Sequence, residues 1–233
     1  QLRSTLNWFE RRPLFGKRVL MTRAKEQAHE LATHLAGYGA DPVEGPTISI
    51  VPPLDWTVVD RAISEIGTYH WMIFTSVNGV DRFMSRLWAK GLDARCLAGR
   101  QVCCIGPRTA QELERFGVRA DLVPAEYQAE GVLAALNQQE ISTSRILIPR
   151  AEVAREILPD QLRARGAHVD VVPVYRTLVP DLKAEGWWQE LRDHRLDVVT
   201  FTSSSTVRNF VAMLGGVDAV SPLLRSVTIA CIG

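Results

Sequence analysis

The strongest constraint on the fold is an internal repeat at one fixed offset of 127 residues, the difference between positions 23 and 150. Five short matches share this offset without a gap: Leu20–Ala24 with Leu147–Ala151, Phe74–Ser76 with Phe201–Ser203, Cys104–Gly106 with Cys231–Gly233, Gly39-Ala40 with Gly166-Ala167, and Pro46 with Pro173. A period this long excludes a solenoid of short repeats. The sequence therefore predicts two related domains.

Each half alternates strand-length apolar runs with amphipathic helical spacing. Short apolar runs, typical of buried parallel strands, occupy 18–22, 71–74, 101–105, 145–148, 198–201 and 227–232. Helical spacing is clearest over Ala28, Leu31 and Leu35 and again over Val80, Phe83 and Leu87. A helix at 109–116 and a short strand at 121–123 are also expected. The alternation predicts an α/β fold with parallel, doubly wound sheets.

Two corresponding segments break this alternation, Asp41–Pro52 and His168–Thr177. Both are rich in β-branched residues and contain prolines, a composition typical of extended chain. We interpret them as connectors between two domains. One reading of their shared offset pairs them with each other as a two-stranded β connector.

Charge and cysteine content narrow the function classes. The net charge of +1 provides no global field for nucleic acid or an anionic membrane, although a local arginine cluster suffices for a small anion. The four cysteines are Cys96, Cys103, Cys104 and Cys231, with no CxxC pair and no histidine at metal-ligand spacing. We interpret them as buried thiols in a reduced, cytoplasmic protein. No apolar run approaches the ~20 residues of a membrane span.

Candidate binding residues gather where predicted strands pass into helices. Ligands of open α/β sheets collect at these carboxyl ends, where helix N-termini offer free N–H groups. The candidates are Arg23, Thr75, Ser76, Asn78, Gly79, Arg108, Thr109, Arg150, Thr202, Ser203 and Ser204. Hydroxyl, amide and guanidinium groups suit carboxylates or phosphates. Two alternatives stay open: Ser76 and Ser203 are only helix N-caps, and the three arginines only face solvent.

Motifs for several common chemistries are absent from the sequence. There is no GxGxxG after a strand, no GxxxxGK[ST] and no GxSxG, so dinucleotide binding, nucleoside-triphosphate binding and hydrolase chemistry lose support. The acidic residues and the five histidines are dispersed along the chain. We therefore expect no cofactor and no metal site.

Four motifs together resemble the uroporphyrinogen-III synthase family. The run Phe74–Val80 is similar to the family's Phe-Thr-Ser-x-Asn-Gly-Val signature, and Ile105–Ala110 to its Ile-Gly-x-x-Thr-Ala turn. Val172–Thr177 resembles the connector that carries Tyr-Arg-Thr, and Arg18–Arg23 resembles the first strand. The motifs lie in family order, and the resemblance covers about 15–233.

The resemblance implies two flavodoxin-like domains with parallel sheets, joined by a two-stranded β connector, and a substrate cleft between them. It also implies that the chain crosses between the domains. Domain 1 would comprise 17–40 and 178–233, the connectors 41–52 and 168–177, and domain 2 residues 53–167. The repeat would then not coincide with the domain boundary.

The activity that the resemblance implies is the cofactor-free closure of hydroxymethylbilane to uroporphyrinogen III, a lyase reaction of tetrapyrrole biosynthesis. Water leaves, and the terminal ring is inverted through a spiro intermediate. Tyr175 is the candidate for assisting the departure of water, its alternative being a packing role in the connector. The candidate binding residues named above would hold the acetate and propionate groups. A monomer without nucleic-acid or membrane partners is expected.

Both ends of the chain carry further expectations. Residues 6–16 resemble the junction of fused methyltransferase–synthase proteins, which makes 1–16 a fusion-junction segment and a covalently linked N-terminal methyltransferase domain a possible partner. Gly233 corresponds to Gly106, so a second Gly-x-x-Thr-Ala turn would lie beyond the given sequence. Two other functions stay open: a non-catalytic two-domain binding protein for an anionic small molecule, and a synthase domain that serves mainly as a regulatory fusion partner.

Overall fold

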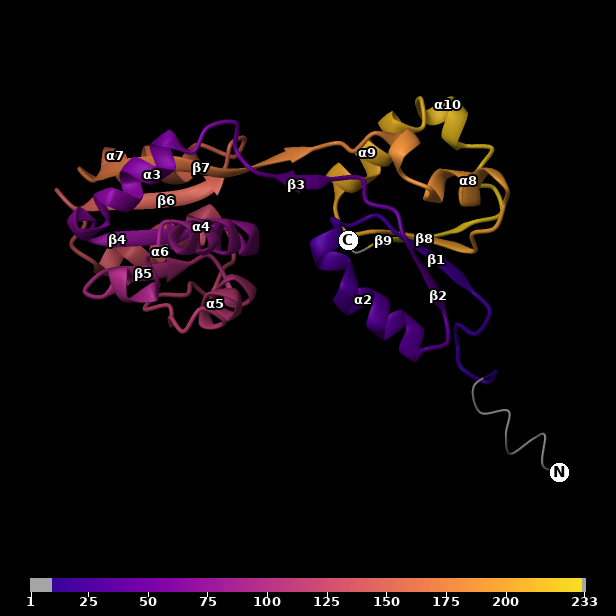
Figure 1. Cartoon of the computed structure of the whole chain (residues 1–233), viewed down its shortest axis with the longest axis horizontal. Coiled ribbons are helices and arrows are strands. Elements are labelled where there is room, and N and C mark those ends of the chain that lie inside the picture. The colour runs from indigo at the N-terminus through magenta and orange to yellow at the C-terminus, as the bar shows by residue number, and fades with distance from the viewer. Residues whose placement is uncertain (1–9, 232–233) are drawn as a thin grey trace. The chain divides into compact units, whose positions relative to one another are not determined.

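The computed structural model describes residues 10–231, apart from the side chains at positions 26, 27 and 184. The chain divides into two compact units, which Figure 1 shows with their elements labelled. Unit 2 is continuous and spans Ile50–Thr177, whereas unit 1 combines the residues before it with those from Leu178 onward. Each unit is built on a sheet of parallel strands, so the predicted α/β fold with parallel sheets is confirmed.

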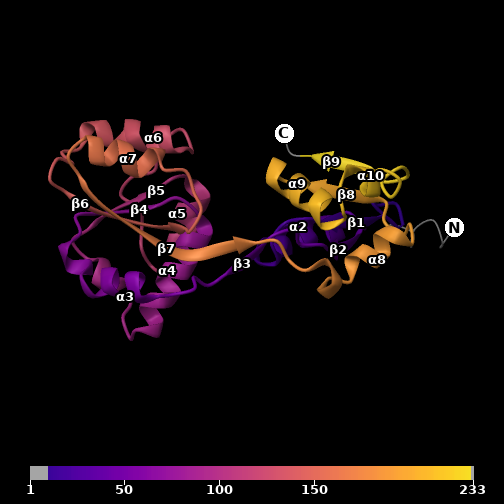
Figure 2. The same ribbon diagram turned by 90° about the horizontal axis from the view of Figure 1, so that it is seen from above.

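Unit 2 contains a five-stranded sheet of order β3-β7-β6-β4-β5. Its strands are β3 (Ser49–Val51), β4 (Trp71–Phe74), β5 (Gln101–Cys104), β6 (Arg145–Ala151) and β7 (His168–Leu178). Its helices are α3 (Thr57–Ser64), α4 (Val77–Ala89), α5 (Pro107–Glu114), α6 (Ala129–Ala135) and α7 (Ile157–Ala164), with short 3-10 turns η1 (Ile66–Thr68), η2 (Ala94–Leu97) and η3 (Leu136–Gln138). Figure 2 shows α6 and α7 on one face of this sheet and α3 and α4 on the other.

Apolar periodicity determines how these helices cover the sheet. All four residues of β4 are buried, as the apolar run predicts for a central strand. The predicted stripe of α4 is fully buried, and Phe83 meets Phe74 edge-to-face with ring centroids 5.9 Å apart. Asp60 of α3 pairs with Arg86 of α4 at 2.7 Å and with Lys90, the C-cap of α4, at 2.6 Å, which joins the two helices.

Unit 1 contains a four-stranded sheet of order β2-β1-β8-β9. Its strands are β1 (Arg18–Met21), β2 (Asp41–Glu44), β8 (Val198–Phe201) and β9 (Thr228–Cys231); its helices are α2 (Lys25–Gly37), α8 (Trp187–Arg192), α9 (Ser204–Met213) and α10 (Val217–Val220), with a 3-10 turn η4 (Leu182–Ala184). Trp187 and Phe210 stack at 5.4 Å in its core, beside the buried Leu20. In Figure 1, α2 lies on one face of the sheet and α8 and α9 lie on the other.

The two sheets are built from interleaved halves of the internal repeat. Strands β1 and β2 correspond to β6 and β7, and β4 and β5 correspond to β8 and β9, but each sheet takes one pair from each copy. The register repeats as well: Arg18 pairs with Asp41 as Arg145 pairs with His168, and Val19 pairs with Val198 as Ile146 pairs with Trp71. Every one of these pairs keeps the 127-residue offset. The repeat therefore crosses the boundary between the units.

The structure corrects the extent of the expected connectors. The first part of 41–52 is β2. It forms a parallel ladder with β1 inside unit 1 and does not span the two units. All of 168–177 belongs to β7, which pairs with β6 as far as Tyr175. Pairing between the two expected connectors is confined to the short β3 beside β7. Unit 2 accordingly extends beyond the expected 53–167 at both ends.

Two smaller expectations were wrong, and two lie partly outside the described residues. The strand expected at 121–123 is only an isolated bridge between Leu122 and Cys103. Cys231 is exposed, whereas Cys103 and Cys104 are buried as predicted and Cys96 is half-buried; all four residues of the edge strand β9 are exposed. Residues 1–9 of the junction segment and Gly233 of the expected second turn are outside the described residues.

Candidate functional site

The best-formed candidate site lies at the carboxyl ends of β4, β5 and β6 in unit 2. Parallel strands bring their carboxyl ends to one edge of the sheet, so the turns that follow them lie together. Helices α4 and α5 begin at this edge, and their first turns direct backbone N–H groups toward it. Candidates from three separate parts of the sequence are thereby brought into one region.

Ser76 joins the N-terminus of α4 to Tyr175. The Oγ of Ser76 accepts a hydrogen bond of 3.0 Å from the backbone N–H of Gly79, which makes Ser76 the N-cap of the helix. The same Oγ lies 3.1 Å from the hydroxyl of Tyr175, whose side chain is only 7% exposed. Ser76 is thus an N-cap, but it also orients the hydroxyl of the catalytic candidate.

Gly79 allows the first turn of α4 to approach the end of β6. A Cβ at this position would lie 2.9 Å from the carbonyl oxygen of Pro149, a backbone atom that cannot rotate away. The predicted Gly79 is therefore a close-packing residue. Asn78 lies beside it in the same turn and is half-buried.

Arg150 is buried at the end of β6 and does not face solvent. It is 6% exposed; its Nη1 donates a 2.8 Å hydrogen bond to the carbonyl of Arg155, and its Nη2 pairs with the exposed carboxylate of Glu156. Its Nε has no hydrogen-bond partner among residues 10–231. Arg150 lines a pocket of about 340 Å³ together with Thr75, Ile105, Tyr127, Ala154, Leu158 and neighbouring residues. The solvent-facing alternative is thus excluded for this arginine.

A second pocket of about 430 Å³ adjoins the first at the N-terminus of α5. Its lining comprises Ile105, Gly106, Pro107, Arg108, Thr109 and Tyr127. Thr109 is buried and Arg108 is exposed. Ile105 and Tyr127 line both pockets, so the two are neighbours.

The remaining candidates form a separate group in unit 1. Arg23 follows β1 and is half-buried, and Thr202, Ser203 and Ser204 follow β8, the neighbour of β1. The Oγ of Ser203 accepts a 3.3 Å hydrogen bond from the N–H of Thr206 and lies 2.8 Å from the Oγ of Ser205. Ser203 is therefore the N-cap of α9, the counterpart of Ser76.

Two thiols end the strand that leads into the site, and both are protonated. Burial raises the pKa of Cys103 and Cys104 to about 12, so both thiols stay protonated, although they end β5 just before the pockets. Within the described part of the chain no group of three or more His, Cys, Asp and Glu side chains could hold a metal ion. In the same residues no helix is both long and apolar enough to span a membrane.

Sequence reasoning missed two residues of this site, Tyr127 and Glu156. Tyr127 stands in the polar loop before α6, where only its aromatic character among small and charged neighbours set it apart. Glu156 is one of several exposed polar residues between β6 and α7, and its pairing with Arg150 depends on the path of that loop. No periodicity could have identified either one.

Comparison with known proteins assigns the family. The family model described as Uroporphyrinogen-III synthase HemD matches residues 29–233. A Synechococcus elongatus uroporphyrinogen-III synthase is 36% identical over 228 residues, covering 95% of this chain and 84% of that protein. A Ruminiclostridium josui porphyrin biosynthesis protein HemD is 32% identical over 232 residues; all of this chain aligns but only 45% of that protein, so the chain spans less than half of that relative's length.

A solved structure agrees with the fold. A mutant uroporphyrinogen III synthase from the extremely thermophilic bacterium Thermus thermophilus superposes with a TM-score of 0.63 at 17% identity, covering 93% of this chain and 85% of that one. That likeness supports the two-unit parallel α/β architecture described above. The family model that matches most of the sequence and the relative that is 36% identical show that this chain belongs to the uroporphyrinogen-III synthase family.

Proposed function

We propose that this chain is a uroporphyrinogen-III synthase that closes hydroxymethylbilane, with loss of water and inversion of the terminal ring. The observation that carries the proposal is the pairing of Tyr175 with Ser76 at the N-terminus of α4, in a chain of this family. The pair provides a buried hydroxyl, and Thr75, which precedes Ser76 in the sequence, lines a pocket together with Arg150. Family membership favours this activity over the non-catalytic binding protein.

The first step requires a proton for the departing hydroxyl. When the hydroxymethyl C–O bond breaks, the pyrrole nitrogen supplies the electrons and the hydroxyl leaves as water if it receives a proton. The azafulvenium cation that results becomes the azafulvene when the pyrrole N–H proton leaves. Tyr175 is the donor that we propose. Because Ser76 accepts from Gly79, its own proton can be donated to the Tyr175 oxygen, which leaves the Tyr175 O–H free for the substrate.

Positioning decides which product forms. The azafulvene can be attacked by either of two carbons of the terminal pyrrole, and only attack at the substituted carbon leads through the spiro intermediate to the inverted ring. A site that holds the reacting atoms in one geometry can lower the barrier of the held reaction by roughly 7 kcal/mol or more in well-oriented systems, which favours the attack that this geometry allows. The enzyme therefore works mainly by fixing the carboxylate side chains of its substrate.

We propose that both groups of candidates bind those carboxylates. In unit 2, Arg150 offers a buried guanidinium, and the first turns of α4 and α5 offer N–H groups near Thr75, Asn78 and Thr109. In unit 1, Arg23 and the Thr202–Ser204 turn offer the corresponding groups. A substrate with eight carboxylates has enough anionic groups for both.

The test is the isomer composition of the product. The protein is incubated with freshly made hydroxymethylbilane, the product is oxidised, and the type I and type III isomers are separated by chromatography. Predominantly type III product supports the proposal, and its slower formation by Tyr175→Phe supports the tyrosine's role. Type I alone, at the rate without enzyme, contradicts the proposal and favours the binding protein.

Location, oligomeric state and a fused domain can each be tested by one simple experiment. We propose a cytoplasmic monomer, which cell fractionation and light scattering examine directly. A methyltransferase fused before residue 1 is proposed from residues 6–16 alone, and reading the upstream coding sequence decides it. None of these affects the assignment of the site.

A further inference from the structure

We propose that Tyr127 receives one pyrrole ring of the substrate against its exposed aromatic face, while Arg150 binds a carboxylate on the same ring. This inference rests on the proposed synthase activity and adds a residue that the family motifs in this sequence do not contain. Tyr127 would be a positioning residue, since it binds a ring and transfers no proton.

The position of Tyr127 suits a platform for a flat ring. Its side chain is 64% exposed at the carboxyl edge of the sheet, and it lines both pockets. Pockets of about 340 and 430 Å³ are within the range for small-molecule sites, and each is too small for a whole tetrapyrrole. A ring that enters either pocket meets the side chain of Tyr127.

Two glycines hold this platform in place. A Cβ on Gly106 would lie 3.1 Å from the Cγ of Tyr127, so the bare backbone at the start of α5 lets the tyrosine ring settle against it. A Cβ on Gly131 would lie 2.0 Å from the carbonyl oxygen of Glu126, so the residue before Tyr127 is packed directly on the first turn of α6. The tyrosine is exposed, yet its backbone and one part of its ring are supported.

Arg150 supplies the second, independent observation. It lines the same pocket as Tyr127, it is 6% exposed, and its Nε has no partner within the described residues. A guanidinium and an aromatic ring that line the same pocket match the two parts of a pyrrole that carries acetate and propionate, one flat and electron-rich, the other anionic.

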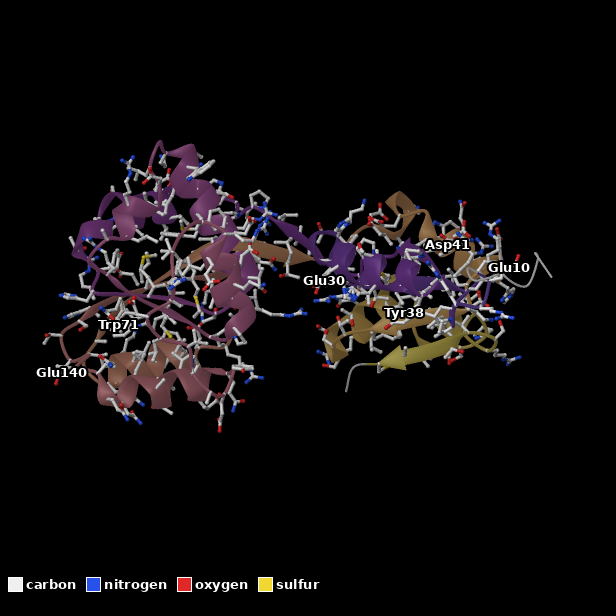
Figure 3. The ribbon with its side chains drawn as sticks, turned by 90° about the horizontal axis from the view of Figure 1, so that it is seen from below. Glu10, Glu30, Tyr38, Asp41, Trp71 and Glu140 are labelled. Carbon is white, nitrogen blue, oxygen red and sulfur yellow. The ribbon has the colours of Figure 1, made fainter. Side chains whose placement is uncertain are left out.

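The experiment compares three variants by steady-state kinetics with hydroxymethylbilane. Tyr127→Leu removes the aromatic face, and Tyr127→Phe keeps it while removing the hydroxyl. Tyr38→Leu is the matched control, because Tyr38 is 58% exposed at the end of α2 in unit 1 (Figure 3) and contributes to neither pocket. Thermal unfolding of each variant checks that the fold is retained.

We expect Tyr127→Leu to raise KM by about three- to tenfold and to increase the share of type I product, since a stacked aromatic pair contributes that much to binding. Tyr127→Phe should retain the KM of the unaltered protein within about twofold, as should Tyr38→Leu. The rescue by phenylalanine separates a stacking role from a hydroxyl or folding role.

The outcomes distinguish this inference from the proposed function. If the unaltered protein makes type III product and Tyr127→Leu behaves as Tyr38→Leu does, the role of Tyr127 is refuted and the synthase activity stands. If Tyr127→Phe is as impaired as Tyr127→Leu, stacking is refuted. If the unaltered protein makes no type III product, the proposed function fails and this inference fails with it.

Discussion

The hydroxyl of Tyr175 and the Oγ of Ser76 lie 3.1 Å apart, although 99 residues separate them in the sequence. The contact exists because β7 and β4 end at the same edge of one parallel sheet, on either side of β6. A strand residue is thereby tied to a helix N-cap, so the position of the phenol depends on how α4 begins.

Removing the Ser76 hydroxyl should therefore affect both stability and turnover. Ser76→Ala loses an N-cap, which costs about 1 kcal/mol of unfolding free energy, and leaves Tyr175 without this partner. We expect kcat to fall about tenfold or more. Ser203→Ala, which removes the equivalent cap of α9, is the comparison for the loss of stability; because Ser203 is itself a binding candidate, only its unfolding is compared. Urea unfolding should give similar losses for the two, and an unchanged kcat in Ser76→Ala would refute the orienting role.

A methyl group at Gly79 should displace the first turn of α4. Gly79→Ala places a Cβ 2.9 Å from the carbonyl of Pro149, and overpacking of this kind costs about 1–3 kcal/mol. Gly37→Ala, in the last turn of α2, is the control, since its added Cβ meets nothing within 4 Å and should be neutral or slightly stabilising. Thermal unfolding measures both; equal midpoints would contradict the close packing.

Substrate binding should depend on the planar guanidinium group of Arg150 and not on its positive charge alone. Arg150→Lys keeps the positive charge but loses the fork that binds Glu156 and Arg155, so we expect KM to rise about tenfold. Arg115→Lys, on an exposed ion pair with Glu112, is the control and should leave KM unaltered. A KM unaffected by Arg150→Lys would mean that this arginine does not bind substrate through a planar contact.

The cysteines should differ sharply in reactivity toward a disulfide reagent at pH 8. Burial raises the pKa of Cys103 and Cys104 to about 12, so they should react only after unfolding, whereas the exposed Cys231 should react at once. Cys231→Ser should remove the rapid phase. Rapid labelling of Cys103 or Cys104 in the native protein, located by peptide mapping, would contradict their burial.

Acid should weaken unit 2 through Asp60. Hydrogen bonding to Arg86, aided by Lys90, lowers the pKa of this carboxyl to about 2. A lowered folded-state pKa means stability that is present above about pH 4 and is lost as the pH falls through about 2. Asp60→Asn should thus cost about 1 kcal/mol at pH 7 and progressively less as the pH falls below 4.

Asp160→Asn is the control for this effect. Asp160 forms only a 3.3 Å surface pair with Arg163, so its replacement should change little at any pH. Urea unfolding at pH 7, 4 and 3 measures the difference between the two variants. A loss at Asp60 that is the same at every pH would point to packing and not to its charge.

Periodicity predicted the parts of the fold that depend on local pattern and on the repeat. The stripe of Val80, Phe83 and Leu87 is buried as expected, and the matched runs that contain β1 and β6 are equivalent strands that pair with their neighbours in the same register. The connector boundaries were less predictable, because an extended segment such as β2 reads the same whether it pairs with a neighbouring strand or spans two domains.

The candidate site was predictable only where a residue type has a fixed local role. Ser76, Gly79 and Thr109 follow apolar runs, and their place at the sheet edge follows from the strand they succeed. Tyr127 and Glu156 are brought to the pocket by loop paths, which depend on packing such as that of Gly131 against Glu126. The burial of Arg150 and the exposure of Cys231 likewise depend on what covers each strand end.

The interleaving of the repeat imposes an order on the folding of the two units during synthesis at the ribosome. Thr22 of unit 1 donates a hydrogen bond to the carbonyl of Thr200, 178 residues later, so β1 must wait for β8 to be translated. Unit 2 is continuous and ends at Thr177, so it emerges complete before that strand exists. Leu20 and Met21 are fully buried in the finished fold, but until β8 is translated this strand is not there to cover them. The nascent chain therefore carries a folded unit 2 together with an unpaired strand edge. Chaperones can bind this edge, proteases can cleave it and neighbouring chains can pair with it.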